Sequence, residues 1–204
     1  MPTSRMEAFS DGVIAILITV MVLELHDPHG TDWSALRKTT PTLLTYVLSF
    51  IYLGIYWNNH HHLLMATDKV DGLVLWANLH LLFWLSLVPF TTSWLGENHF
   101  ATIPVAVYGI NLLAAAFAFY GLSRALVRVQ GPDGLLAAAI GNDVKGKVSP
   151  AIYSVAIPVA FVNRWVGFAL YVVVALMWLV PDRRVERTIA AGLPGAGRDT
   201  AATG

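Results

Sequence analysis

The sequence predicts an all-α, polytopic membrane protein with six transmembrane helices per subunit. Of its 204 residues, 56% are hydrophobic and only 13% are charged, and the mean hydropathy is +0.59. A soluble domain carries about 25% charged residues, so this chain has too little charge to cover a surface in water. We therefore expect the lipid bilayer to be its main solvent. The 13 basic and 13 acidic residues cancel, which argues against a nucleic-acid partner.

Six apolar segments predict the six helices, because a hydrocarbon core of ~30 Å takes ~20 residues of helix. In chain order the segments are 8–25, 41–64, 72–95, 101–122, 151–162 and 165–180. The segment 151–162 is the weakest, since it is short and contains Pro158, and a re-entrant hairpin stays open for it. Small residues permit close helix contact in membranes, and the spans hold three such glycines: Gly109, Gly121 and Gly167.

The charges of the expected loops predict how the helices are oriented. One side carries Arg5, Lys69, Arg124, Arg128, Lys145, Lys147, Arg183, Arg184 and Arg187. The opposite side carries the basic residues Arg37, Lys38 and Arg164. By the positive-inside rule we expect a multi-pass protein of the inner cell membrane with both termini in the cytoplasm. We assign residues 1–185 to the six-helix membrane domain and the Gly-, Ala- and Thr-rich residues 186–204 to a disordered cytoplasmic tail.

The first span begins with polar residues that a simple membrane anchor would not need. Ser10 and Asp11 stand at its entrance. A carboxylate in or near the bilayer costs at least ~2.5 kcal/mol, so Asp11 is expected to have a partner. Arg5 lies ~120° away around the helix and cannot pair with it, which points to another helix or another subunit. The alternative is that Asp11 is an interfacial residue that the helix dipole favours.

One face of the same helix carries an apolar stripe with a single hydroxyl group. The stripe consists of Ile16, Thr19, Val20 and Leu23, spaced i, i+3, i+4 and i+7. Such a stripe is typical of a seam between packed helices. It also suits a pore lining, in which Glu24 or Asp27 would concentrate cations at the outer mouth. The spacing alone leaves both interpretations open.

A second polar cluster lies at the end of the second span and within the third. Its members are Asn58, Asn59, His60, His61, His62, Asn78 and His80. Three consecutive imidazoles spread over ~200° of helix, which is poor geometry for one metal ion, and we predict no metal site. Such residues more often form hydrogen bonds between membrane helices. We expect His60 or His61 to be the partner of Asp11 or Ser10.

These residues together resemble a known family. Arg5, followed after three residues by Phe9-Ser10-Asp11, is similar to the signature of the transmembrane protein 175 family of potassium channels. The resemblance covers the first three spans, and the rest of the chain matches in hydropathy and length alone. It continues through Ala15-Ile16, Thr19, Leu23-Glu24, Tyr56-Trp57, His60-His61, Leu79 to Leu82 and Ser86 to Phe90.

The resemblance implies an architecture and roles for these residues. It implies a homotetramer of six-helix subunits in which the first helix lines a central pore, without a carbonyl-lined filter. The constriction positions would be Ile16, Thr19 or Val20, and Leu23. The structural network that ties the first helix to the second and third would contain Arg5, Phe9, Ser10, Asp11, Trp57, His60, His61 and Asn78.

The resulting functional hypothesis is a weakly to moderately K⁺-selective channel that conducts passively through a hydrophobic constriction. Potassium would be the permeant ion, and no cofactor is expected. The chain contains no Gly-rich phosphate loop and no Gly-x-Ser-x-Gly motif, so we do not predict an enzyme. Two alternatives stay open: a proton- or cation-coupled transporter that uses Asp11 and the histidine cluster, and a membrane scaffold or small-molecule-binding protein without conductance.

Overall fold

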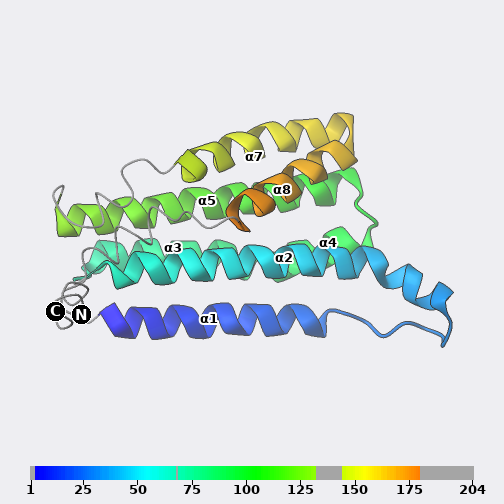
Figure 1. Cartoon of the computed structure of the whole chain (residues 1–204), viewed down its shortest axis with the longest axis horizontal. Coiled ribbons are helices and arrows are strands. Elements are labelled where there is room, and N and C mark those ends of the chain that lie inside the picture. The colour runs from blue at the N-terminus through cyan, green and yellow to red at the C-terminus, as the bar shows by residue number, and fades with distance from the viewer. Residues whose placement is uncertain (1–2, 68, 132–143, 180–204) are drawn as a thin grey trace, which may run out of the picture.

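The computed structural model describes residues 3–67, 69–131 and 144–179 of the chain. Every regular element within these ranges is a helix. The helices are α1 (Thr3–Leu23), α2 (Trp33–Met65), α3 (Gly72–Ser86), α4 (Val88–Glu97), α5 (Thr102–Gln130), α7 (Val144–Val162) and α8 (Arg164–Leu179). Figure 1 shows them packed side by side in one bundle, roughly along its long axis, with α3 and α4 following each other in a single pass. This all-helical arrangement confirms the predicted fold class; the predicted tail 186–204 lies outside the described residues.

The lengths of the helices agree with passage through a bilayer. Within the described residues, four passes are both long and apolar enough to cross it: α1, α2, the α3–α4 pair and α5. Helix α8 is apolar but has 16 residues. Helix α7 begins before the predicted segment 151–162 and continues through Pro150 and Pro158. Prolines are tolerated in membrane helices because neighbouring groups satisfy the freed carbonyls, so Pro158 does not break this helix.

The predicted third span is interrupted near its middle. Helix α3 ends at Ser86, Leu87 forms the joint, and α4 begins at Val88. Pro89 causes the interruption, because it has no backbone N–H and its ring conflicts with the carbonyl four residues earlier. The Leu87 amide instead donates to the Trp84 carbonyl at 3.3 Å, a tighter turn than an α-helix makes.

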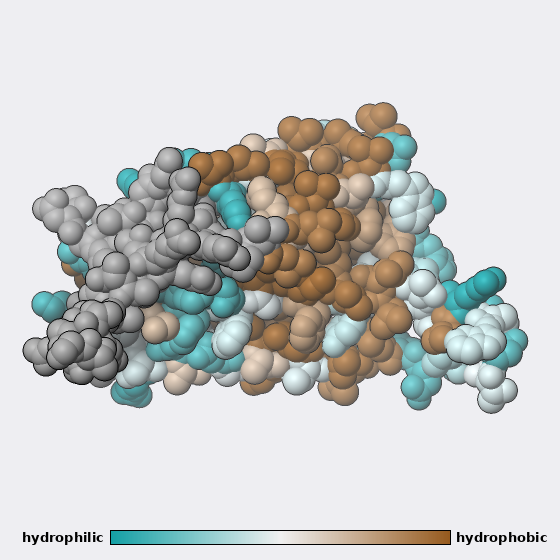
Figure 2. Space-filling model, in the orientation of Figure 1, coloured by the Kyte–Doolittle hydropathy of each residue, from teal (hydrophilic) through white to brown (hydrophobic). Residues whose placement is uncertain are grey.

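The interior consists of two apolar clusters that share α2 and α5. One cluster packs α1 and α3 around Leu53, Leu81 and Leu122. The other packs α7 and α8 around Tyr108 and Tyr171. Large apolar side chains also cover the outside, and Figure 2 shows a hydrophobic band over the middle of the molecule with hydrophilic residues toward the end on the right. An exposed apolar band of this kind is the surface that lipid covers.

Candidate pore helix and its polar network

Helix α1 has one buried face and one exposed face. The buried face contains Met6, Ser10, Ile14, Leu17 and Met21. It packs against α2, α3 and α4. The predicted stripe lies on the exposed face, where Ile16 is 60% and Leu23 79% exposed, with Thr19 and Val20 also accessible. The stripe therefore does not pack against another helix of the same subunit.

The Thr19 hydroxyl is oriented by its own helix. Its Oγ1 donates to the Ile16 carbonyl at 2.9 Å. A threonine hydroxyl has one hydrogen and two lone pairs, so this bond uses the donor and leaves oxygen lone pairs on the exposed face. The stripe thus offers an electron-rich oxygen between apolar side chains.

A buried hydrogen-bond chain connects α1, α3 and α2. Asn78 donates through Nδ2 to the Ser10 hydroxyl at 2.9 Å, and Ser10 donates to the Met6 carbonyl at 2.8 Å. The Asn78 carbonyl oxygen lies 2.8 Å from Nε2 of His60. Because that oxygen can only accept, His60 carries its hydrogen on Nε2, and its buried Nδ1 has no partner among the described residues.

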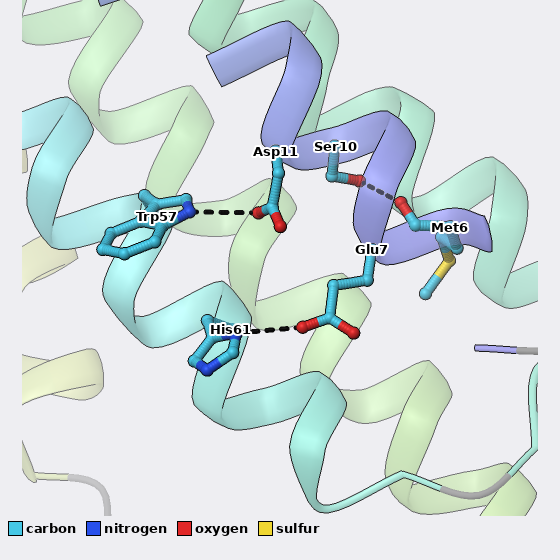
Figure 3. Close-up of polar contacts among 6 residues, drawn as sticks. All are labelled: Met6, Glu7, Ser10, Asp11, Trp57 and His61. Carbon is cyan, nitrogen blue, oxygen red and sulfur yellow. Dashed lines mark hydrogen bonds and ion pairs between the residues drawn. The ribbon is translucent and has the colours of Figure 1, made fainter. Parts of the chain in front are cut away.

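A second set of contacts connects α1 and α2 closer to the surface (Figure 3). The Trp57 indole donates to Asp11 at 3.0 Å, and Nδ1 of His61 lies 2.9 Å from the Glu7 carboxylate. The Trp57 and His61 rings stack with 6.1 Å between their centroids. Glu7 and Asp11 are four residues apart on α1, as Trp57 and His61 are on α2, so two matched pairs face each other.

The expected partnerships of the motif residues are only partly found. Within the described residues, no histidine forms a hydrogen bond directly with Asp11 or Ser10. Trp57 donates to Asp11, and Asn78 donates to Ser10. The expectation of a histidine partner was wrong because the Trp57 indole occupies the Asp11 carboxylate and the Asn78 amide occupies the Ser10 hydroxyl oxygen. Glu7 belongs to the network and was missed, although its four-residue spacing from Asp11 was a usable signal.

Two members of the predicted network lie outside it. Arg5 and Phe9 are exposed, and within the described ranges no hydrogen bond or ion pair connects either residue to α2 or α3. Their side chains leave the bundle on the outer side of α1. Nor do the described residues contain a group of three or more His, Asp or Glu side chains able to hold a metal ion.

The acidic residues after the stripe lie at the far end of α1. The helix ends at Leu23, and Glu24 turns toward α4. There the Ser93 hydroxyl stands 3.4 Å from the Glu24 carboxylate and 3.2 Å from that of Glu97. Asp27 borders a cavity of about 250 Å³ that Glu97 also lines. Glu97 therefore joins the two predicted acidic residues at this end.

An up-and-down helical bundle with an apolar exterior and polar contacts between its first three passes defines the class as a polytopic α-helical membrane protein. The profile of the family described as "Endosomal/lysosomal potassium channel TMEM175" matches residues 5–89. A potassium channel of Chryseobacterium sp. (strain P1-3) is 49% identical over 189 residues, which cover 93% of this chain and 98% of that relative. The chain belongs to the TMEM175 family.

More distant members agree with this assignment. The crystal structure of a lysosomal potassium-selective channel TMEM175 homolog from Chamaesiphon minutus superimposes with a TM-score of 0.76 at 28% identity, covering 89% of this chain and 97% of that chain. The endosomal/lysosomal proton channel TMEM175 of Danio rerio is 28% identical over 132 residues, or 62% of this chain and 24% of that relative. Family membership was predicted correctly from the Phe9-Ser10-Asp11 motif.

Proposed function

We propose that four copies of this chain form a potassium-permeable channel whose central pore is lined by α1. The observation that carries the proposal is the exposed stripe of α1, which the subunit itself leaves uncovered. One helix at the edge of a bundle cannot enclose a pore, so the conducting path requires further copies of the chain. The potassium channel of Chryseobacterium and the potassium-selective structure from Chamaesiphon minutus support this assignment.

The apolar residues of the stripe form the constriction. Rings of Ile16 and Leu23 around an axis leave a narrow, dry throat that gates by dewetting. Val20 lies between them and is 36% exposed. Glu24 and Asp27 lie past the end of the helix, where their carboxylates raise the local cation concentration at the mouth.

Ion preference arises from Thr19. Its hydroxyl hydrogen is engaged with the Ile16 carbonyl, so a ring of these oxygens presents lone pairs to a partly dehydrated cation. Without a ring of charge or carbonyls, discrimination is weak to moderate and follows the easier dehydration of the larger ion. Potassium therefore permeates better than sodium.

The polar network holds α1 in the rotation that this path needs. Ser10 and Asp11 are bonded to α3 and α2, on helix faces that keep the stripe turned away from the bundle. Both termini lie on the cytoplasmic side of the inner membrane in this arrangement. The basic residues Arg124, Arg128 and Lys147, at one end of the bundle, agree with that orientation.

The test is a reversal potential measured on purified protein in a planar bilayer, with K⁺ on one side and Na⁺ on the other at equal concentration. We expect a K⁺-selective reversal potential that Thr19→Ala moves toward zero. Ile16→Ala and Leu23→Ala are expected to raise the conductance by widening the throat. The control is Val22→Ala, an exposed α1 residue outside the stripe. The pore assignment is contradicted if Ile16→Ala, Leu23→Ala, Val22→Ala and the wild type all form tetramers and all have the same conductance.

Proton conduction is the second candidate, favoured by the name of the Danio rerio relative. Here Asp11, Glu7 and His61 supply titratable groups beside α1. The same bilayer with a pH gradient and no K⁺ gradient separates the two functions. A current that follows the pH gradient and is lost in Asp11→Asn favours proton transport, whereas a current that follows K⁺ favours the channel.

A further inference from the structure

A cavity of about 460 Å³ lies between α2, α5, α7 and α8 and includes no residue of α1. This volume is within the range of roughly 300–1,000 Å³ that small-molecule sites occupy. Its wall is apolar and aromatic, with Ile55, Ala116 and Phe119 among the lining residues. The proposed pore does not use this space.

Several polar groups of the cavity wall are already hydrogen-bonded within the protein. The Tyr153 hydroxyl donates to the Tyr52 hydroxyl at 3.2 Å, and Tyr52 donates to the Tyr171 carbonyl. The Ser149 hydroxyl accepts from the Trp178 indole at 2.8 Å. The interior consequently presents ring faces and aliphatic groups, and an apolar chain fits it better than a polar solute.

The rim of the same cavity is basic. Arg124 and Arg128 on α5 and Lys147 on α7 contribute to its lining, all three with exposed side chains, and the described residues of the lining include no carboxylate. The ion pair found within the described residues joins His61 to Glu7, away from this rim. Among the described residues, positive charge is thus concentrated at one edge of an apolar space.

The two arginines also repel each other. They are four residues apart on one helix, where Cβ atoms are ~5–6 Å apart and like charges destabilise the helix. The Arg124 guanidinium lies 6.0 Å from the centroid of the Tyr120 ring, another lining residue, so it stays beside the cavity. A bound anion would relieve this repulsion.

We propose that this cavity is a binding site for an anionic phospholipid. The phosphate lies at the rim between Arg124, Arg128 and Lys147, and an acyl chain fills the space beside Ile55 and Phe119. Guanidinium groups bind phosphate through paired hydrogen bonds, and basic pockets between transmembrane helices bind anionic headgroups. Free phosphate would satisfy only the rim, whereas a lipid matches both halves of the site.

The test is performed on the full-length chain in neutral detergent. Phosphatidylglycerol, phosphatidylcholine and glycerol 1-phosphate are added separately, and bound lipid is counted by native mass spectrometry while the midpoint of thermal unfolding is followed. We expect phosphatidylglycerol alone to be retained and to raise the midpoint. Its affinity falls about fivefold for each arginine removed in Arg124→Gln and Arg128→Gln. Should the protein that carries both arginine substitutions not be recovered, Lys147→Gln is compared with the wild type in the same way, and its affinity for phosphatidylglycerol should also fall.

Two matched controls separate this site from a general effect of charge or volume. Arg37→Gln with Lys38→Gln removes two exposed basic residues at the other end of α2 and should leave lipid retention unchanged. Ala116→Leu narrows the cavity and should reduce retention, whereas Ala114→Leu lies outside the lining and should not. Equal retention of phosphatidylcholine, equal protection by glycerol 1-phosphate, or equal losses in the control variants overturn the proposal.

Discussion

The two sides of the bundle hold their helices together in different ways. On the α1 side, side chains make directed bonds between helices, as Asn78 does with Ser10 and His60. On the α7–α8 side, small residues bring backbones into contact: a Cβ added to Gly167 would lie 2.8 Å from the Cβ of Ala160. The α1 side depends on directed hydrogen bonds, whereas the α7–α8 side combines close backbone packing with hydrogen bonds such as the one from Trp178 to Ser149.

The difference follows from what each helix has to do. Lipid provides no hydrophobic drive for helix association, so membrane helices are held by packing and by polar bonds. Helix α1 exposes much of its apolar surface, including Ile16 and Leu23, and packs through one narrow face. Hydrogen bonds with fixed geometry set the rotation of α1 about its own axis. Close packing over so small a face would not fix that rotation.

The largest expected effect is the loss of the buried bonds of α1. Asn78→Leu keeps the branched shape of the side chain but leaves Nε2 of His60 without its acceptor and the Ser10 oxygen without its donor. A buried polar group that loses its partner costs ~1–3 kcal/mol. We expect a loss of about 3 kcal/mol and a lower midpoint of thermal unfolding by about 10 °C in detergent. The control is Asn58→Leu on the exposed side of α2, which should change little. Equal midpoints for both variants would mean that packing alone holds α1.

The next effect tests close packing on the other side. Gly167→Ala places a methyl group 2.9 Å from the Ala160 backbone and 3.0 Å from the Ala156 carbonyl, so the α7–α8 pair must separate. Overpacking of this kind costs typically about 2 kcal/mol. Gly121→Ala is the control, because nothing lies within 4 Å of the added Cβ. The measurement is the midpoint of thermal unfolding of both variants. A Gly167→Ala protein as stable as Gly121→Ala would contradict close packing between α7 and α8.

A smaller effect is expected at the outer, partly exposed pair of the α1 network. Asp11→Ala removes the acceptor of the Trp57 indole. The bond is partly exposed to solvent, so its loss costs about 1 kcal/mol within the subunit. Because α1 also carries the proposed subunit contacts, we expect the yield of tetramer in size-exclusion chromatography to fall more than ion preference changes. A stable tetramer with inverted selectivity would place Asp11 in the conduction path instead.

Much of this could be predicted from the sequence because hydropathy and periodicity are local properties. The helices follow from the apolar segments, and the shared face of Thr19 and Ile16 follows from their helical spacing. The interruption at Leu87 does not follow from hydropathy; its cause is Pro89, a residue type expected to kink or start a helix. Proline disturbs a helix over four residues, and whether it starts, kinks or ends one depends on the packing around it.

The polar contacts were predicted as a group but not as pairs. Sequence spacing places Asp11 and His61 near the same interface, yet partner choice depends on the relative rotation and height of two helices. The indole of Trp57 reaches Asp11, and His61 meets Glu7 one turn away. The basic cavity was missed for the same reason, since Arg124 and Lys147 come together only through the crossing of α5 and α7.

The smallest expected effect lies in water, at the start of α2, where neither lipid nor packing contributes. Asp32 caps this helix: its carboxylate accepts from the Ser34 hydroxyl at 2.8 Å and from the Ala35 amide at 3.0 Å. The Ser34 bond first, then the Ala35 bond, lower the pKa of Asp32 below its ordinary value of 3.8. A lowered pKa in the folded state adds stability above the unfolded value, and this contribution is lost as the pH falls through the folded value.

Asp32→Asn keeps a capping oxygen but cannot titrate, so it separates the charge from the cap. We expect its midpoint of thermal unfolding to lie below that of the wild type near neutral pH, by on the order of 2 °C. The difference should disappear below the folded pKa of Asp32, where the wild-type carboxyl is also neutral. Asp32→Ala should stay lower at every pH because it lacks the cap itself. A difference in unfolding midpoint between the wild type and Asp32→Asn that persists at low pH would show that the charge of Asp32 does not act through this cap. Directed bonds would then matter in this chain only where lipid or protein surrounds them.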